Sequence, residues 1–257
     1  MKIRCIPVTA ILMYAFGMSP IFAADNPVMR LASLEWAPYV GSRLHQEGLT
    51  AGIVKVAARQ IGMDAKISYS PWSRTVYAGL NDPNYAGYFP AFYLKEREKT
   101  CYFSGVLGHS VVGFAHLKER PFQWTKLNDL RGIKIGIVQD YANGEEFDAM
   151  VKQRVLDTDA APSDVSNLRK LLAHRVDVIV IDKYVLHQLL ASEPSLQADK
   201  NRIEYYPHEL AKFSMHICFQ RNERGLAIQK AFNLALNKID TQKLEDSYFQ
   251  QLDAAQK

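Results

Sequence analysis

The sequence predicts an α/β fold with mostly parallel strands. Short apolar runs alternate along the chain with segments whose apolar residues recur at helical spacing, the pattern of successive strand and helix units. The 257 residues are 48% hydrophobic and 23% charged, with 14 glycines and 11 prolines, which excludes a disordered, collagenous or multi-span membrane protein. At this length we expect one large domain or two lobes of about 100 residues each.

Residues 1–23 have the composition of an export signal. Lys2 and Arg4 give a positive start, residues 6–18 are uncharged and mostly apolar, and small residues follow around Ala23. The apolar run is shorter than the ~20 residues of a membrane-spanning helix, so it predicts cleavage and a periplasmic protein rather than an anchor. Without this segment the chain has 29 basic and 27 acidic residues, a balance that gives no support to a nucleic-acid partner.

Strands are predicted at short runs rich in β-branched and aromatic residues, and helices where apolar residues share one stripe, as between Ile53 and Ile61. In the first half these rules predict a strand at 29–34, a helix at 47–63, a strand at 65–69, a helix at 73–80 and strands at 88–92, 101–107 and 111–116. In the second half they predict a strand at 131–138, helices at 143–155 and 164–174, a strand at 176–182, a helix at 184–191, strands at 203–206 and 213–219, and helices at 228–239 and 244–252.

Five segments carry a family resemblance. In order they are LEWAPY after the first strand, PWSRTVYAGL after the second, FPAFYLKEREKTCYFS across the third and fourth, LRGIKIGIVQDYANGEEF in the middle, and LLAHRVDVIVID later. Together they resemble the extracytoplasmic solute-binding proteins of the polar amino-acid family, solute-binding protein family 3. The resemblance extends over essentially all of the chain after the export signal.

The resemblance implies the type II periplasmic-binding-protein fold, in which two Rossmann-like α/β lobes are joined by two hinge crossovers. A ligand is held in the cleft between the lobes, and hinge motion closes them around it. Carried onto this chain, the family architecture implies lobe one at 24–107 plus 216–257, lobe two at 112–210, and hinges near 107–111 and 211–215.

Two charged residues match ligand-binding positions of the family. Arg97 matches an arginine that binds a ligand carboxylate, a task suited to a planar guanidinium that donates two parallel hydrogen bonds. The alternative is a solvated charge run, since residues 95–99 are all charged. Asp182 matches an acid that binds a ligand ammonium, and it stands at the carboxyl end of a strand, where open α/β sheets place ligands. Its alternative role is the N-cap of the next helix.

Further candidates follow from the same resemblance. Trp72 and Trp36 match aromatic residues that stack on ligand side chains, with burial in a core as the alternative. Arg74 near the cleft would favour a ligand with more than one anionic group. Glu35 is expected to face the cleft, with a surface position as the alternative.

The segment at Tyr141 and Ala142 precedes a predicted helix. Its backbone amides are therefore expected to face an anion at the helix N-terminus.

Three positions depart from the family pattern. Ser33 stands where amino-acid-binding members carry an Asp, Phe92 where they carry a Ser or Thr, and Tyr102 where they carry another Asp. An aromatic-lined pocket containing Phe92 and Arg97 therefore suits other small carboxylates as well as an amino acid.

Cys101 and Cys218 remain after removal of the export signal, in a compartment that permits disulfides. Both stand in predicted strands, and a disulfide and two buried free thiols are both open, since sequence does not fix their separation. Only His216 lies near either cysteine at ligand spacing, so no metal site is predicted.

The function implied is that of a monomeric periplasmic protein that captures a small polar or carboxylate solute, an amino acid or a related compound, for an ABC permease. Presentation of the ligand to a membrane sensor is one alternative, and a lyase or dehydratase on the same fold is another. The sequence contains no G-x-S-x-G, H-E-x-x-H or Walker motif, so no catalytic residue and no cofactor are predicted.

Overall fold

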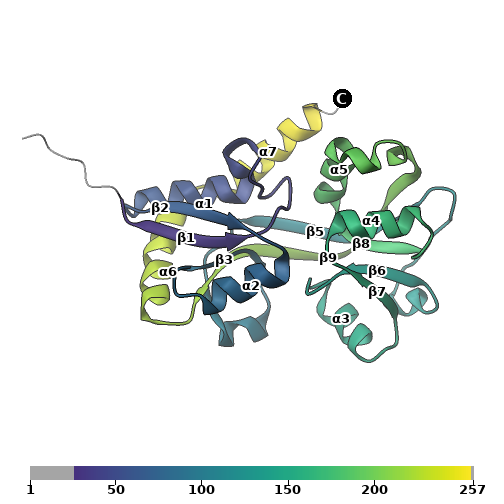
Figure 1. The fold of residues 1–257 in the computed structure, drawn as a ribbon, viewed down its shortest axis with the longest axis horizontal. Helices are drawn as coiled ribbons and strands as arrows, with labels where there is room; N and C mark the ends of the chain where they lie inside the picture. Colours follow the sequence, from purple (N-terminus) through teal and green to yellow (C-terminus); the bar gives the residue numbers. More distant parts are fainter. Residues whose placement is uncertain (1–25, 256–257) are drawn as a thin grey trace, which may run out of the picture.

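The computed structural model describes residues 26–255, so the export signal predicted at 1–23 lies outside the described residues. These residues form two α/β lobes that lie side by side (Figure 1). The first lobe contains β1 (Val28–Ser33), α1 (Leu49–Gln60), β2 (Asp64–Tyr69), α2 (Trp72–Asn81), β3 (Gly87–Phe92), β4 (Cys101–Phe103), α6 (Glu223–Leu236) and α7 (Thr241–Ala255).

Two long strands, β5 (Gly108–Leu117) and β9 (Ile203–Gln220), run from one lobe into the other (Figure 1). The second lobe contains β6 (Lys134–Val138), α3 (Glu145–Lys152), β7 (Asp157–Ala161), α4 (Asp164–Leu172), β8 (Val178–Asp182) and α5 (Lys183–Ser192). The two segments predicted as hinges lie next to each other, because Gly108 pairs with Met215 and Val111 with Lys212.

All the strands belong to one nine-stranded sheet of order β2-β1-β3-β9-β5-β8-β6-β7, with β4 also paired to β9. Within each lobe the strands β1, β2 and β3, or β6, β7 and β8, are parallel. The crossing strands are antiparallel to their neighbours. The predicted α/β class is therefore confirmed, but the sheet is mixed, because the chain crosses between the lobes twice in opposite directions.

Packing follows the predicted patterns closely. In α1 the buried residues include Ile53, Val54, Ala57 and Ala58, which share one stripe against the first sheet half. A separate cluster in the second lobe centres on Phe114, whose neighbour Ala115 joins the main core instead. Successive residues of β5 thus serve opposite faces of the sheet, as strand geometry requires.

Several predicted boundaries were wrong. The strands expected at 203–206 and 213–219 are one 18-residue strand. The residues between them continue the backbone pairing with β5, but they are largely exposed and therefore have no apolar pattern. β7 was missed because it lies at the sheet edge, only its last residue is buried, and it has no apolar run. The strand expected at 101–107 ends at Phe103, and the helix expected at 143–155 is the shorter α3.

The two cysteines are bonded. Cys101 on β4 and Cys218 on β9 form a disulfide with a Cα–Cα distance of 5.4 Å across a sequence separation of 117. The bond links the short edge strand β4 to the end of β9, whose first residues lie in the second lobe. Within residues 26–255, no helix has the length and apolar character needed to cross a membrane.

Candidate functional site

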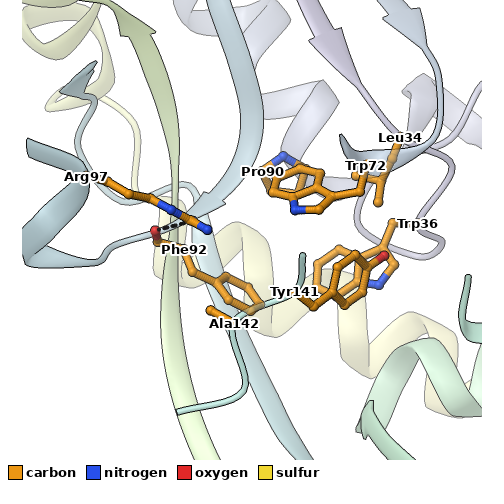
Figure 2. Close-up of a pocket in the computed structure, with 8 residues that line it drawn as sticks. All are labelled: Leu34, Trp36, Trp72, Pro90, Phe92, Arg97, Tyr141 and Ala142. Atoms are coloured by element: carbon orange, nitrogen blue, oxygen red, sulfur yellow. Dashed lines mark hydrogen bonds between the residues drawn. The ribbon is translucent and has the colours of Figure 1, made fainter. Parts of the chain in front are cut away.

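The two lobes meet at a pocket lined mainly by aromatic and apolar side chains. Figure 2 shows the arrangement, with the rings of Trp36, Trp72 and Tyr141 beside one another and Arg97 approaching from the opposite end. Trp36 and Trp72 meet the Tyr141 ring edge to face, at centroid distances of 6.5 and 6.1 Å. The pocket is lined by Leu34, Trp36, Trp72, Pro90, Phe92, Arg97, Tyr141 and Ala142.

These rings leave a volume of about 20 Å³, enough for about one water molecule. The pocket therefore admits a larger solute only after the aromatic side chains or the lobes move. Six of the predicted site residues are brought together here, namely Trp36, Trp72, Phe92, Arg97, Tyr141 and Ala142.

Arg97 differs from the charged residues around it. It lies in a short 3-10 helix (Lys95–Lys99) and is half-buried, whereas Glu96 and Glu98 on either side are exposed. Its Nη1 donates a hydrogen bond to the carbonyl oxygen of Phe92 at 3.2 Å, which holds the guanidinium at the pocket (Figure 2). Within the charge run, this position sets Arg97 apart from a purely solvated residue.

Hydrogen bonds also cross between the lobes beside the pocket. The indole N–H of Trp72 donates to the carbonyl oxygen of Asp140 at 3.1 Å, and the hydroxyl of Ser73 donates to the Asp140 carboxylate. Both donors stand at the start of α2, and Asp140 follows β6. The first turn of α2 is therefore the part of lobe one that contacts this loop.

Three acids mark one edge of the second lobe. Asp140 follows β6, Asp164 follows β7, and Asp182 ends β8. Because these three strands are parallel, their carboxyl ends meet at the same edge, which faces the first lobe. The burial and hydrogen bonding of the three carboxylates then decide what each of them can do.

Asp182 is fully engaged by the protein. One oxygen accepts hydrogen bonds from two backbone N–H groups in the first turn of α5, at 2.8 and 2.9 Å. The other accepts from the hydroxyls of Tyr39 and Ser110 and from the Val111 N–H, at 2.9, 2.7 and 3.0 Å. Asp182 thus occupies the capping position that was its alternative role, and a ligand ammonium would have to displace one of these donors.

Asp164 is the acid that sequence reasoning missed. It is 7% exposed at the start of α4, and the nearest hydroxyl hydrogen bond, from Tyr141, is long at 3.5 Å. Burial, with a smaller contribution from the charge of Asp182, raises the pKa of Asp164 to about 7. A signal was present in the sequence, since Ser163 and Asp164 stand between the end of a strand and a predicted helix, but β7 itself was not recognised.

Asp164 faces a second, larger cavity of about 430 Å³ between the lobes. Its lining includes the rings of Trp36, Tyr69, Trp72 and Tyr141. The indole N–H of Trp36 is buried there without a hydrogen-bond partner.

Glu35 also lines the larger cavity. It remains exposed, and its carboxylate accepts hydrogen bonds from the backbone and hydroxyl of Ser42. Both expectations for Glu35, a cleft position and a surface position, therefore describe part of its environment.

Arg74 and the Tyr141 amide have surroundings that differ from those expected. Arg74 is exposed on α2 and lines neither of these two cavities. The backbone N–H of Tyr141 donates to the Val138 carbonyl oxygen, and Asp148 of α3 accepts from the Asn143 N–H. With Glu145 and Glu146 also in its first turn, α3 presents acids rather than an empty anion site.

No protein-family model and no curated protein matches this sequence. Solved structures do match in fold. The GluR0 ligand-binding core from Nostoc punctiforme, in complex with L-glutamate, has a TM-score of 0.69 at 19% identity, over 86% of this chain and 99% of that one. A P235GK mutant of the arginine-binding protein ArgBP from T. maritima has a TM-score of 0.71 at 15% identity, over 87% and 95%.

A histidine kinase sensor domain with similarity to periplasmic binding proteins has a TM-score of 0.72 at 14% identity, over 87% of this chain and 96% of that one. The resemblance first detected in the sequence motifs is thereby confirmed at the level of the fold. The chain has the two-lobed type II fold of the periplasmic amino-acid-binding proteins.

Proposed function

We propose that this protein is a periplasmic solute-binding protein that captures a small polar or carboxylate solute, an amino acid or a related compound, by closing two lobes around it. The observation that carries the proposal is that both lobes line the larger cavity. Trp36 and Trp72 come from the first lobe, and Tyr141 and Asp164 come from the second. A solute that touches both sets binds the closed state more tightly than the open one and so shifts the equilibrium toward closure.

The proposed lobes are 24–107 plus 216–257 and 112–210, with hinges near 107–111 and 211–215. Two features of the crossing strands support this division. Gly108 has a φ of +153°, a backbone conformation that favours glycine, and β5 and β9 lose regular register between Val112 and Ala115. A bend at these positions would move both crossing strands together, since they are hydrogen-bonded to each other.

Arg97 is proposed to bind a carboxylate of the solute. Its guanidinium stays charged, and its one hydrogen bond in the structure leaves further N–H groups able to form a bidentate pair. The pairing would take place beside the rings of Trp36 and Trp72, in a site largely shielded from water.

Delivery of the solute to an ABC permease is the proposed output, with the protein acting as a monomer. Presentation to a membrane sensor is the second candidate, favoured by the fold shared with a histidine kinase sensor domain. The structures compared above are binding proteins and a sensor domain, which supports a binding role over the lyase or dehydratase alternative.

Identification of the solute is the first experiment. The protein is purified without denaturation from its periplasmic location, and the small molecules released on unfolding are identified by mass spectrometry. Stoichiometric retention of one compound supports a binding protein, whereas its conversion to a product on incubation would contradict the proposal.

The Arg97→Ala variant then tests the carboxylate contact. We expect the solute to bind at least 30-fold more weakly, because a hydrogen-bonded charge pair is worth about 2 kcal/mol or more. Arg74→Ala is the matched control, since Arg74 is exposed and outside both cavities. Equal affinity of the Arg97→Ala variant and wild type, measured by calorimetry, would overturn the role of Arg97.

A further inference from the structure

The C-terminal helix α7 contacts both lobes. It packs on α1 of the first lobe, and its far end approaches α5 of the second (Figure 1). The ring of Phe249 on α7 stacks on the ring of Tyr184 in the first turn of α5, with centroids 3.8 Å apart and an interplanar angle of 17°. Phe249 is only 7% exposed, so this contact between the lobes is buried.

Phe249 also meets the ring of Tyr39 in the first lobe, edge to face at a centroid distance of 5.7 Å. The hydroxyl of Tyr39 in turn donates to the carboxylate of Asp182, two residues before Tyr184. Phe249 therefore contacts one ring from each lobe. A rotation that parts the lobes moves Phe249 and Tyr39 relative to Tyr184 and so disrupts the stack.

A second contact joins α7 to the predicted hinge. Glu245 lies four residues before Phe249, so the two side chains share one face of the helix. The Glu245 carboxylate is buried and accepts a hydrogen bond from the backbone N–H of His109 at 2.6 Å, and it pairs with the His109 ring at 3.0 Å. A Cβ atom on the neighbouring Gly108 would lie 3.4 Å from this carboxylate. The position of α7 is thus coupled to strand β5 where that strand leaves the first lobe.

The stack on Tyr184 is present in a closed arrangement of the lobes. On the cleft side, Trp72 and Ser73 of the first lobe donate hydrogen bonds to Asp140 of the second. A contact that exists in the closed arrangement and is disrupted in an open one shifts the equilibrium toward closure. Phe249 lines neither the Arg97 pocket nor the larger cavity, so its contribution to closure requires no contact with a solute.

We propose that Glu245 and Phe249 are positioning residues that set the balance between closed and open lobes. Glu245 holds α7 on the hinge strand, and Phe249 supplies a ring contact that favours closure before a solute binds. The inference rests on the proposed function, because the balance matters only if a solute is captured between the lobes. A solute that binds the closed state more tightly has an overall affinity that increases with the closed fraction of the free protein.

The test measures the distance between the lobes in solute-free protein. The chain is produced from residue 24 onward, freed of solute by unfolding and refolded with the disulfide between Cys101 and Cys218 intact. Spin labels are attached at Tyr77→Cys on α2 and Lys152→Cys on α3, two exposed sites on different lobes. Pulsed electron paramagnetic resonance then gives the populations of closed and open molecules.

Wild type should show a measurable closed population without solute. The Phe249→Leu variant should lower the ratio of closed to open molecules about three- to tenfold, the effect expected from loss of an aromatic pair. Tyr184→Leu should have the same effect, and the double variant should add little to either, because each single change already removes the stack. Glu245→Ala should also lower the ratio, since α7 then loses its contact with the hinge strand.

Phe232→Leu is the matched control. Phe232 is a fully buried phenylalanine on α6 that meets Phe219 within the first lobe. The control removes a ring of the same size, so it should lower the melting temperature but leave the ratio of closed to open molecules unchanged. The melting transition of each variant also shows that it is folded.

The inference would be overturned by the absence of a closed population in solute-free wild type, by equal ratios in wild type and Phe249→Leu, or by an equal fall in the Phe232→Leu control. Additive losses in the double variant would show that the two rings act independently, and an unchanged ratio in Glu245→Ala would overturn the role of Glu245. The proposed function is tested separately, by retention of a solute. A protein that retains its solute with an unchanged closed fraction contradicts only the role of α7, and lobes that close without retaining a solute contradict only the proposed function.

Discussion

Asp182 and Asp164 are both buried at the carboxyl edge of the second lobe, at the ends of β8 and β7, the two strands that flank β6, but their surroundings differ. Asp182 accepts five hydrogen bonds and connects α5, the first crossing strand and Tyr39 of the first lobe. Asp164 has one long hydrogen bond and faces a cavity. A buried carboxylate whose oxygens all accept hydrogen bonds from the protein stabilises the fold. A buried carboxylate with few such bonds can still accept hydrogen bonds from a ligand.

The largest expected effect is on the stability contributed by Asp182. Asp182→Ala removes the acceptor for two buried hydroxyls and a backbone N–H, together with the N-cap of α5. We expect a loss of about 4 kcal/mol in the free energy of unfolding, measured by urea denaturation at pH 7. A loss below about 1 kcal/mol would show that these hydrogen bonds are replaced by water and would remove the contrast with Asp164.

Asp164 should have the opposite effect on stability. Its pKa is raised to about 7 in the folded protein, so the native state binds the extra proton, and stability should fall as the pH rises from about 4 to about 7. The penalty is absent below pH 4 and complete above pH 7. We expect Asp164→Asn to be more stable than wild type by about 2–4 kcal/mol at pH 8 and equal to it near pH 4.

Urea denaturation of both proteins across this pH range checks the difference, in which the contributions of other carboxyl groups cancel. A difference that does not change with pH would mean that Asp164 titrates normally and is not desolvated.

The smallest effects sharpen the comparison through the two tyrosines that contact these acids. Tyr39→Phe removes a 2.9 Å hydrogen bond to Asp182 and should cost about 1–2 kcal/mol of unfolding free energy. Tyr141→Phe removes a 3.5 Å contact with Asp164 and should cost less than about 0.5 kcal/mol. Similar losses in both variants, measured by thermal unfolding, would contradict the assignment of different roles to the two acids.

Part of this site was predictable because local sequence carries its signals. The stripe on α1, the apolar run of β8 and the aromatic motifs around Trp36 and Trp72 are local patterns, and all are present in the structure. Only the family motif identified Arg97 as a ligand-binding candidate, because all five residues of the run 95–99 are charged and composition does not distinguish one from another. Its half-burial depends on the position of the 3-10 helix beside β3.

The surroundings of Arg74, Tyr141 and Asp164 were not predictable from local sequence. Arg74 lies two residues after Trp72 on α2, a rotation of about 200° that places it on the opposite, solvent-facing side of the helix. Tyr141 was expected to offer a free amide, but its N–H is used in the turn that follows β6. Asp164 was overlooked because the strand before it, β7, is a partly exposed edge strand without an apolar pattern.

The sequence by itself determined the alternation of strands and helices, the family resemblance and the residue types available for binding, because these depend on local periodicity and composition. Only the tertiary structure decided which buried acid is fully hydrogen-bonded, which two strands cross between the lobes as a pair, and that Cys101 forms a disulfide with Cys218. Those outcomes depend on contacts between residues far apart in the chain, whose distances and hydrogen-bond partners no local pattern specifies.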